Sequence, residues 1–174
     1  NAGNLNPDHW ADKKAQGGRI IGEVCHFIDL AQYFTNSKVS SVSAYQNGTS
    51  AGDHIINLEM ESGSIINITY VTSGNRRHRR ESVEIYCGGK IISIENFKKA
   101  RSISTSSTKT ISNWLSTDRG HVNQLNHLYK LISNPHATNQ NDRDYINTTL
   151  TSFAIEQAIL TRENQTLSSY QDLI

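Results

Sequence analysis

Three side chains that can bind hydroxyl groups or transfer protons recur at every third position of one short segment. Glu23, His26 and Asp29 follow a pair of glycines, and this spacing places side chains along one side of a helix. An imidazole with carboxylates on either side is suited to general acid–base chemistry, because a neighbouring acceptor holds it in one tautomer. The same spacing is typical of a solvated helix face, so the residue types alone leave both interpretations open.

Nucleophilic and metal-dependent chemistry are less well supported. Cys25 precedes His26, but adjacent helical side chains point about 100° apart, so we expect Cys25 in the core rather than paired with the histidine. The seven histidines form no H-E-x-x-H motif or other ligand spacing, and two cysteines cannot make an all-cysteine zinc site. No metal site is therefore predicted.

Three other groups of residues could contact a ligand. The run Arg76–Arg80 could hold a phosphate by bidentate hydrogen bonds, although a solvated loop partly neutralised by Glu81 is the simpler interpretation. Asp8-His9-Trp10 combines a charge, an imidazole and an aromatic ring, which suits a sugar or a base and equally suits an anchor for the chain. Gly17-Gly18 precede a predicted helix, whose free N–H groups could receive an anion, or they form a plain turn.

The hydrophobic pattern predicts the elements that position these residues. Apolar side chains with helical spacing predict a helix over residues 19–34. From residue 39 to about 103 the apolar residues alternate, which predicts strands, and short turn signals between them favour hairpins and a largely antiparallel meander. The expected turns and loops lie at residues 61–64, 74–80, 88–89 and 104–109.

Helical spacing returns near residue 118. One predicted helix ends at Asn134-Pro135, because proline cannot continue a helix, and a second is predicted over residues 143–164 with Asp142 as its N-cap. The first of these carries an apolar stripe of Val122, Leu125, Leu128, Tyr129 and Ile132. The order helix, strands, helices predicts an α+β fold: a largely antiparallel open sheet with helices packed on one face.

Composition excludes several classes of function. The 174 residues fit one domain, and 17 Lys+Arg against 16 Asp+Glu give a net charge of +1, too small for binding nucleic acid or an anionic membrane. No apolar run reaches the ~20 residues of a membrane helix, and the first residues lack a secretory signal. Two cysteines that are not spaced as a pair fit a reducing compartment, so we expect a cytoplasmic protein. The sequence contains neither G-x-G-x-x-G nor G-x-x-x-x-G-K-[ST], so the usual cradles for NAD and ATP are missing.

An ordered set of segments resembles the C-terminal domain of the Gfo/Idh/MocA family of NAD(P)-dependent oxidoreductases. The segments are NAG and PDHW within residues 1–10, GGRIIGEVCHFIDL from Gly17, GGK and IENF within 88–97, and DRGHVNQL at 118–125. The resemblance is closer still to two-part bacterial oxidoreductases, in which a zinc-alcohol-dehydrogenase-like half precedes this domain. It implies that residues 1–174 form a single substrate and oligomerisation domain. It also implies that an N-terminal Rossmann domain, which holds NAD or NADP and supplies a catalytic lysine, is missing from this chain.

The resemblance also assigns roles to residues. In the family, the helix after the glycines delivers an Asp-x-x-x-His pair to the active site, and His26 matches the histidine as general acid/base or ligand of a substrate hydroxyl. The aspartate position falls on Gly22, which has no side chain, and Glu23 stands one position along as its candidate replacement. Residues expected to shape the substrate pocket are Gly17, Gly18, Arg19, His9, Trp10 and, toward a phosphate or nucleotide, Arg77.

We therefore predict the C-terminal domain of an NAD(P)-dependent dehydrogenase that acts on a hydroxyl or keto group of a sugar-like substrate, with nucleotide sugars included. The isolated chain is expected to be inactive and to form a homo-oligomer through its sheet. The alternative is a non-catalytic binding and dimerisation module, which the glycine at position 22 favours. The two predictions differ in whether His26 matters to turnover.

Overall fold

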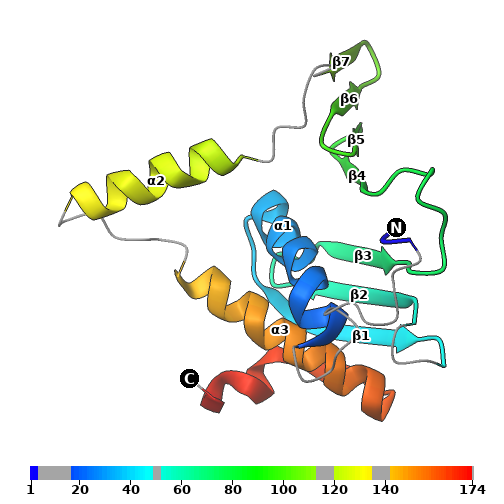
Figure 1. The fold of residues 1–174 in the computed structure, drawn as a ribbon, viewed down its shortest axis with the longest axis vertical. Helices are drawn as coiled ribbons and strands as arrows, with labels where there is room; N and C mark the ends of the chain where they lie inside the picture. The colour runs from blue at the N-terminus through cyan, green and yellow to red at the C-terminus, as the bar shows by residue number, and fades with distance from the viewer. Residues whose placement is uncertain (4–16, 49–51, 113–119, 135–141, 174) are drawn as a thin grey trace. The chain divides into compact units, whose positions relative to one another are not determined.

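The computed structural model describes residues 1–3, 17–48, 52–112, 120–134 and 142–173 (Figure 1). Contacts divide the chain into two compact units, which are described separately. The helix-covered unit comprises Ala2–Gly74 and Gln140–Ile174, and the meander unit comprises Asn75–Asn139 with Asn1. Both cysteines, Cys25 and Cys87, are free.

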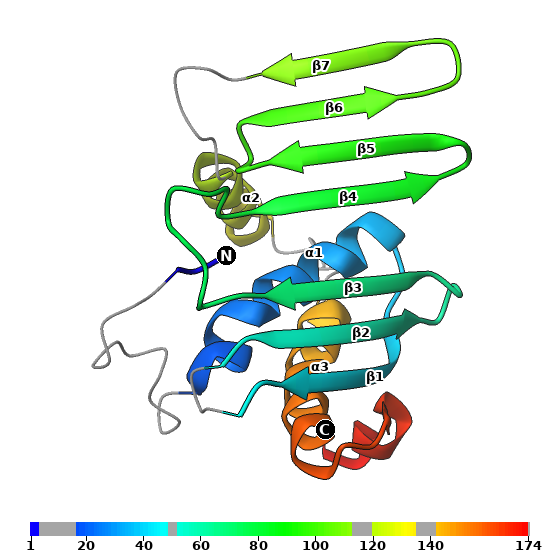
Figure 2. The ribbon, with the colours of Figure 1, turned by 90° about the vertical axis from the view of Figure 1, so that its right-hand side faces the viewer.

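The helix-covered unit is a four-stranded antiparallel sheet with helices on one face, as the sequence predicts (Figure 2). The strand order is β3 (Ile65–Tyr70), β2 (His54–Met60), β1 (Val39–Gln46) and β8 (Gln165–Thr166). The covering helices are α1 (Cys25–Thr35) and α3 (Asp142–Thr161), and a 3-10 helix, η4 (Leu167–Leu173), follows β8. The 61–64 turn joins β2 and β3 as a hairpin, which confirms that prediction.

The core of this unit lies between the sheet and the helices. On β2, Ile56 and Leu58 are completely buried, whereas Ile55 on the opposite face is 51% exposed. Val24 and Ile28 from the first helical segment and Ile155 from α3 are also completely buried and belong to the same cluster. The strict alternation on β2 is therefore the sequence signal that fixes which face of the sheet the helices cover.

The predicted helix over residues 19–34 is present but begins irregularly. A π-helical turn, η3 (Ile20–Val24), precedes α1, and the Cys25 N–H donates to the Ile20 carbonyl. The helix ends where Asn36 adopts a left-handed conformation with φ 47°, as expected of the Thr-Asn-Ser stop. Single π turns inside helices occur often at functional sites, and this one contains Gly22 and Glu23.

The meander unit contains a second antiparallel sheet of four strands in chain order. These are β4 (Ser82–Cys87), β5 (Lys90–Glu95), β6 (Lys99–Ile103) and β7 (Thr108–Ser112). The Gly88-Gly89 hairpin is confirmed, but the polar loop predicted over 104–109 is shorter, because Thr108 and Lys109 pair with Ile103 and Ser102 of β6. Strand β7 escaped prediction because its TKTIS sequence is almost entirely polar, so hydrophobic alternation gives no signal there.

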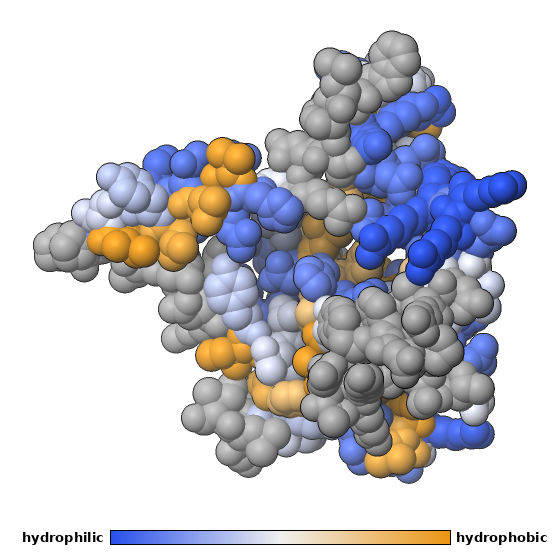
Figure 3. Space-filling model, in the orientation of Figure 1, coloured by the Kyte–Doolittle hydropathy of each residue, from blue (hydrophilic) through white to orange (hydrophobic). Residues whose placement is uncertain are grey.

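The meander unit also carries α2 (His121–Ser133), the helix predicted to end at Asn134-Pro135. Its apolar stripe is present, and none of the helix residues is buried. Val122, Leu125, Leu128, Tyr129 and Ile132 are between 51% and 74% exposed, and the stripe is visible as a hydrophobic band along α2 in Figure 3. None of the helices in the described residues is long and apolar enough to span a membrane.

Candidate active site

The backbone before the first helix depends on glycine. Gly17 has φ +88°, a left-handed conformation, and a Cβ atom placed there would lie 3.2 Å from the Ile21 side chain. Gly18 is also left-handed, with φ +61°. Any other L-residue at position 17 would be strained and crowded, so the Gly-Gly pair forms a turn that starts the helix. An anion site at this helix start stays a prediction.

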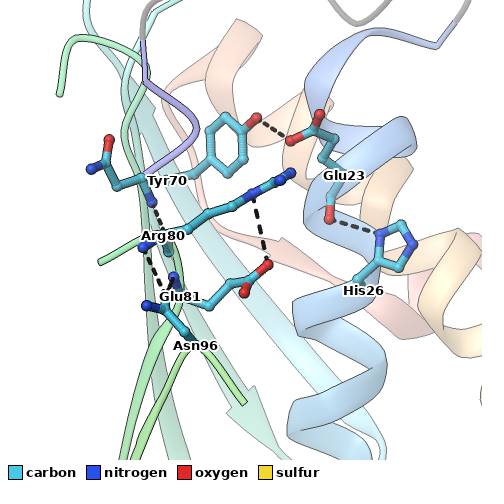
Figure 4. A network of polar contacts seen from close by, with 7 residues as sticks. Glu23, His26, Tyr70, Arg80, Glu81 and Asn96 are labelled. Carbon is cyan, nitrogen blue, oxygen red and sulfur yellow. Dashed lines mark hydrogen bonds and ion pairs between the residues drawn. The ribbon is translucent and has the colours of Figure 1, made fainter. Parts of the chain in front are cut away.

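His26 is exposed on the first turn of α1 and makes one informative hydrogen bond. Its Nδ1 lies 3.0 Å from the backbone carbonyl oxygen of Glu23 (Figure 4). A carbonyl can only accept a hydrogen bond, so Nδ1 must carry the hydrogen and donate. In the neutral imidazole, Nε2 then holds the lone pair. The local backbone thus selects the tautomer, and the exposed side chain presents a proton acceptor.

The carboxylates of Glu23 and Asp29 were expected to lie on either side of the His26 imidazole and to hold its tautomer, and the structure shows a different arrangement. The Glu23 carboxylate accepts a hydrogen bond from the Tyr70 hydroxyl at 2.5 Å, so the backbone of Glu23, and not its carboxylate, fixes the His26 tautomer. Asp29 lies at an exposed position of α1. Partial desolvation, followed by the charge of Asp144, raises the pKa of its carboxyl, and His26 acts in the opposite direction. Glu23 and His26 therefore remain near each other on one turn while using separate partners.

Cys25 is partly exposed, so its expected place in the core is wrong. It lies at the irregular start of α1, and its Sγ is 3.6 Å from His26 Nδ1. Burial is nevertheless the main cause that raises the pKa of this thiol. Since the thiolate is the reactive form, the site does not activate Cys25 as a nucleophile.

Glu23 is bonded to a buried tyrosine, Tyr70, that the sequence analysis did not identify as functional. Tyr70, at the end of β3, is 4% exposed, and its hydroxyl receives a hydrogen bond from Arg19 Nη1 at 3.2 Å. The Arg19 guanidinium also lies 6.0 Å from the centre of the Tyr70 ring. Alternation with Ile66 and Ile68 assigns Tyr70 to the core-facing side of β3, but no sequence signal shows that its hydroxyl meets a carboxylate from the helix.

His54 packs against Tyr70, and Asp53 holds the residues that follow Tyr70. His54 is the direct neighbour of Tyr70 across β2 and β3, and their rings meet edge to face, with centroids 6.1 Å apart. Burial and then the charge of Arg19 lower the pKa of His54. At the same end of β3, Asp53 accepts hydrogen bonds from the backbone N–H groups of Thr72 and Ser73. The hydrogen bond from the Ser73 hydroxyl contributes most to lowering the pKa of Asp53 to about 2.

The other predicted site residues are placed as follows. Arg19 is 4% exposed and bonded to Tyr70, so it supports the site from behind, and a direct contact between Arg19 and substrate stays a prediction. His9 and Trp10 lie outside the described residues. Among the described residues, no three metal-binding side chains of the His, Cys, Asp or Glu type cluster together.

Arg77 belongs to the meander unit, in the exposed loop predicted over 74–80. Its backbone N–H donates to Asn75 Oδ1 at 2.9 Å. In the same loop, Arg79 forms an ion pair with Glu95 at 2.7 Å, and Arg80 lies 3.8 Å from Glu81 (Figure 4). Two of the basic side chains in this loop are thus near carboxylates, as the position of Glu81 suggested, and a phosphate contact of Arg77 stays a prediction.

Comparison with known proteins agrees with the fold and the sequence motifs. The model of the oxidoreductase family C-terminal alpha/beta domain, GFO_IDH_MocA_C, matches residues 2–172. The chain therefore belongs to the Gfo/Idh/MocA oxidoreductase family and represents its C-terminal domain. A search of curated protein sequences found no match.

Solved structures with this fold are distant in sequence. A levoglucosan dehydrogenase in complex with NADH and levoglucosan has a TM-score of 0.78 and 14% identity, covering 94% of this chain and 54% of that protein. An aldose-aldose oxidoreductase from Caulobacter crescentus complexed with glycerol has a TM-score of 0.74 and 15% identity, covering 94% of this chain and 52% of that protein. An oxidoreductase domain protein from Kribbella flavida has a TM-score of 0.76 and 13% identity, covering 93% of this chain and 54% of that protein. The chain spans about half the length of these proteins, and the likeness establishes the fold.

Proposed function

We propose that this chain is the substrate domain of an NAD(P)-dependent dehydrogenase that oxidises a hydroxyl or reduces a keto group of a sugar-like molecule. The observation that carries the proposal is the state of His26: exposed, with Nδ1 donating to the Glu23 carbonyl and Nε2 therefore able to accept a proton. This is the arrangement that a general base for a substrate hydroxyl requires. The residues 1–174 act in this proposal as one domain.

In the direction of oxidation, His26 Nε2 takes the hydroxyl proton while the carbon loses hydride. The hydride acceptor when bound is the nicotinamide of NAD or NADP. This chain lacks G-x-G-x-x-G, and every strand pair among the described residues is antiparallel, unlike the parallel βαβ units of a nucleotide-binding fold. The cofactor is accordingly assigned to a companion Rossmann domain, and this chain contributes substrate binding, orientation and proton transfer.

The substrate class rests on two supports. Glu23 and His26 both offer hydrogen-bond acceptors, which suit hydroxyl groups, and solved structures with this fold include proteins named as a levoglucosan dehydrogenase and an aldose-aldose oxidoreductase. A nucleotide sugar would additionally use the basic loop through Arg77. The choice between NAD and NADP, the two-part arrangement with a zinc-alcohol-dehydrogenase-like half, and the cytoplasmic location stay predictions.

The second candidate function is a binding and dimerisation module without catalysis. Gly22 favours it, because the position that resembles the family's aspartate carries no side chain and lies inside the π turn. In such a module the Glu23 and His26 side chains would be a polar helix face. Loss of turnover on replacing His26 separates the two functions in favour of the dehydrogenase.

The isolated chain and the longer protein are expected to differ in activity. We expect the 174-residue chain to fold and to show no hydride transfer with NAD or NADP and a panel of aldoses and polyols, because the nucleotide cradle is missing from its sequence. The protein encoded by the complete reading frame should be active in the same assay, followed by the absorbance of the reduced nicotinamide. Activity of the isolated chain would overturn the assignment of the cofactor to another domain. A complete reading frame of only these residues would overturn the dehydrogenase proposal in favour of the binding module.

We further propose that the chain forms a homo-oligomer through an apolar row on the sheet of the meander unit. The row runs across all four strands and consists of Val83, Ile94, Ala100 and Ile111. Ile111 is 75% exposed on the edge strand β7. The other three residues of the row are partly exposed, and accessible apolar surface of this kind occurs at interfaces between subunits.

Ile111→Asp is expected to shift the chain from oligomer to monomer, because a carboxylate in an apolar interface is costly to desolvate. Sedimentation equilibrium measures the change. Thr110→Asp is the matched control, since Thr110 is exposed on the opposite face of the same strand. An oligomer that tolerates Ile111→Asp as well as it tolerates Thr110→Asp would exclude this row as the interface.

A further inference from the structure

The buried group behind Glu23 has a fixed direction of hydrogen bonding. Arg19 has only donors, so the Tyr70 oxygen must accept the hydrogen bond from Arg19 Nη1. The single hydroxyl hydrogen of Tyr70 is then available for one acceptor, the Oε2 atom of Glu23, at 2.5 Å. In this chain of hydrogen bonds, Glu23 Oε2 is the acceptor at the end. Burial, followed by the hydrogen bond to Glu23, raises the pKa of Tyr70 to about 12, so the phenol keeps its hydrogen throughout the physiological range.

The group is also held rigidly in space. Arg19 and Tyr70 are each 4% exposed and His54, packed against the Tyr70 ring, is 3% exposed. Rotating the phenol away would break its hydrogen bonds to both Arg19 and Glu23, and the loss of hydrogen bonds between buried polar groups is costly. Glu23, by contrast, is partly exposed, and its second oxygen, Oε1, accepts no hydrogen bond from the residues that the structure describes. The Oε2 atom of Glu23 is thus held by buried Tyr70, and the Oε1 atom can accept a hydrogen bond from a ligand.

We propose that Tyr70 is a positioning residue that, backed by Arg19, holds Glu23 as an oriented carboxylate whose Oε1 accepts a hydrogen bond from a substrate hydroxyl. This inference rests on the proposed function of Glu23 and His26. It assigns different roles to the two residues: His26 transfers the proton, and Glu23 binds and orients the substrate. The supporting feature is a tyrosine on a strand and an arginine on the helix turn, 51 residues apart in the sequence.

The first test is a double-mutant cycle in the complete, active protein. We expect Tyr70→Phe to raise KM by about tenfold with a smaller change in kcat, because it removes the charge-assisted hydrogen bond that orients the Glu23 carboxylate for substrate binding. Glu23→Gln should have an effect of at least the same size. In the Glu23→Gln background, Tyr70→Phe should add less than about twofold, since residues that act through one another are not additive.

A Tyr70→Phe effect of equal size in both backgrounds would overturn the proposal, because it would mean that Tyr70 acts through stability or packing alone. This outcome leaves the proposed function intact if His26→Ala still abolishes turnover. An unchanged KM in Glu23→Gln would overturn both this inference and the role of Glu23 in binding. Urea unfolding of each variant checks that the fold is retained.

The second test uses the 174-residue chain and does not depend on activity or on a stable Tyr70 variant. With tyrosine labelled at Cζ, NMR titration reports the ionisation of each phenol. Glu23→Gln should lower the pH at which Tyr70 ionises, because the hydrogen bond to Glu23 contributes to raising the pKa of Tyr70. The matched control is the exposed pair Tyr86 and Glu84, whose oxygens lie 2.7 Å apart. Glu84→Gln should lower the pH at which Tyr86 ionises and leave that of Tyr70 unchanged. If Glu23→Gln leaves the pH at which Tyr70 ionises unchanged, the proposal is overturned.

Discussion

Replacing His26 by alanine is expected to lower kcat of the complete protein by about 100-fold or more, the usual contribution of a positioned acid or base. The fold should be unaffected, because the His26 side chain is exposed and its one described backbone partner, the Glu23 carbonyl, is in the same turn. His26→Asn sharpens the test. Asparagine can still donate to that carbonyl but cannot exchange a proton, so it should be as inactive as alanine. Steady-state kinetics in both reaction directions measure the loss.

Two controls make this result specific to the site. His121→Ala removes another exposed imidazole, from the start of α2, and should change kcat by less than about twofold. Added free imidazole should partly restore turnover of the alanine variant, because the His26 position is open to solvent. If His26→Ala changes kcat by less than about threefold, His26 has no proton-transfer role. That result would favour the binding and dimerisation module over the dehydrogenase.

Ile56→Ala is expected to lower the free energy of unfolding by about 2–5 kcal/mol, the range found for removing a large aliphatic side chain from a packed core. Ile56 is completely buried at the centre of the sheet, with Ala44 and Ile68, both buried, as its neighbours across β1 and β3. The substitution leaves a cavity in the core between the sheet and the helices, and the size of that cavity sets where in this range the loss falls. Urea denaturation of the 174-residue chain gives the difference.

The adjacent residue provides a control of the same chemical type. Ile55→Ala removes the same atoms from the same strand, but Ile55 is 51% exposed on the open face. Its loss should be less than about 1 kcal/mol, the span of strand propensity at a surface position. Equal losses at 55 and 56 would mean that helices do not cover one face of this sheet.

Most of the fold could be predicted because its elements are amphipathic. Alternation on β2 and β3 and helical spacing over residues 19–34 each report local burial, and burial of apolar surface is what selects these elements. Strand β7 was missed in part because its residues are polar, and the partial exposure of Cys25 was missed because the helix there begins with a π turn. Periodicity assumes regular geometry, so it fails where the backbone departs from it.

The residue pattern was sufficient for the family and for the helix that carries Glu23 and His26, and it predicted an acid–base role for His26. The packing of the elements set which partner each of these side chains has. It gave His26 a backbone acceptor and gave Glu23 the Tyr70 hydroxyl, with Arg19 behind it. The physical reason is that spacing along a chain describes neighbours on one element, whereas a buried hydrogen bond between a strand and a helix depends on how the two elements pack.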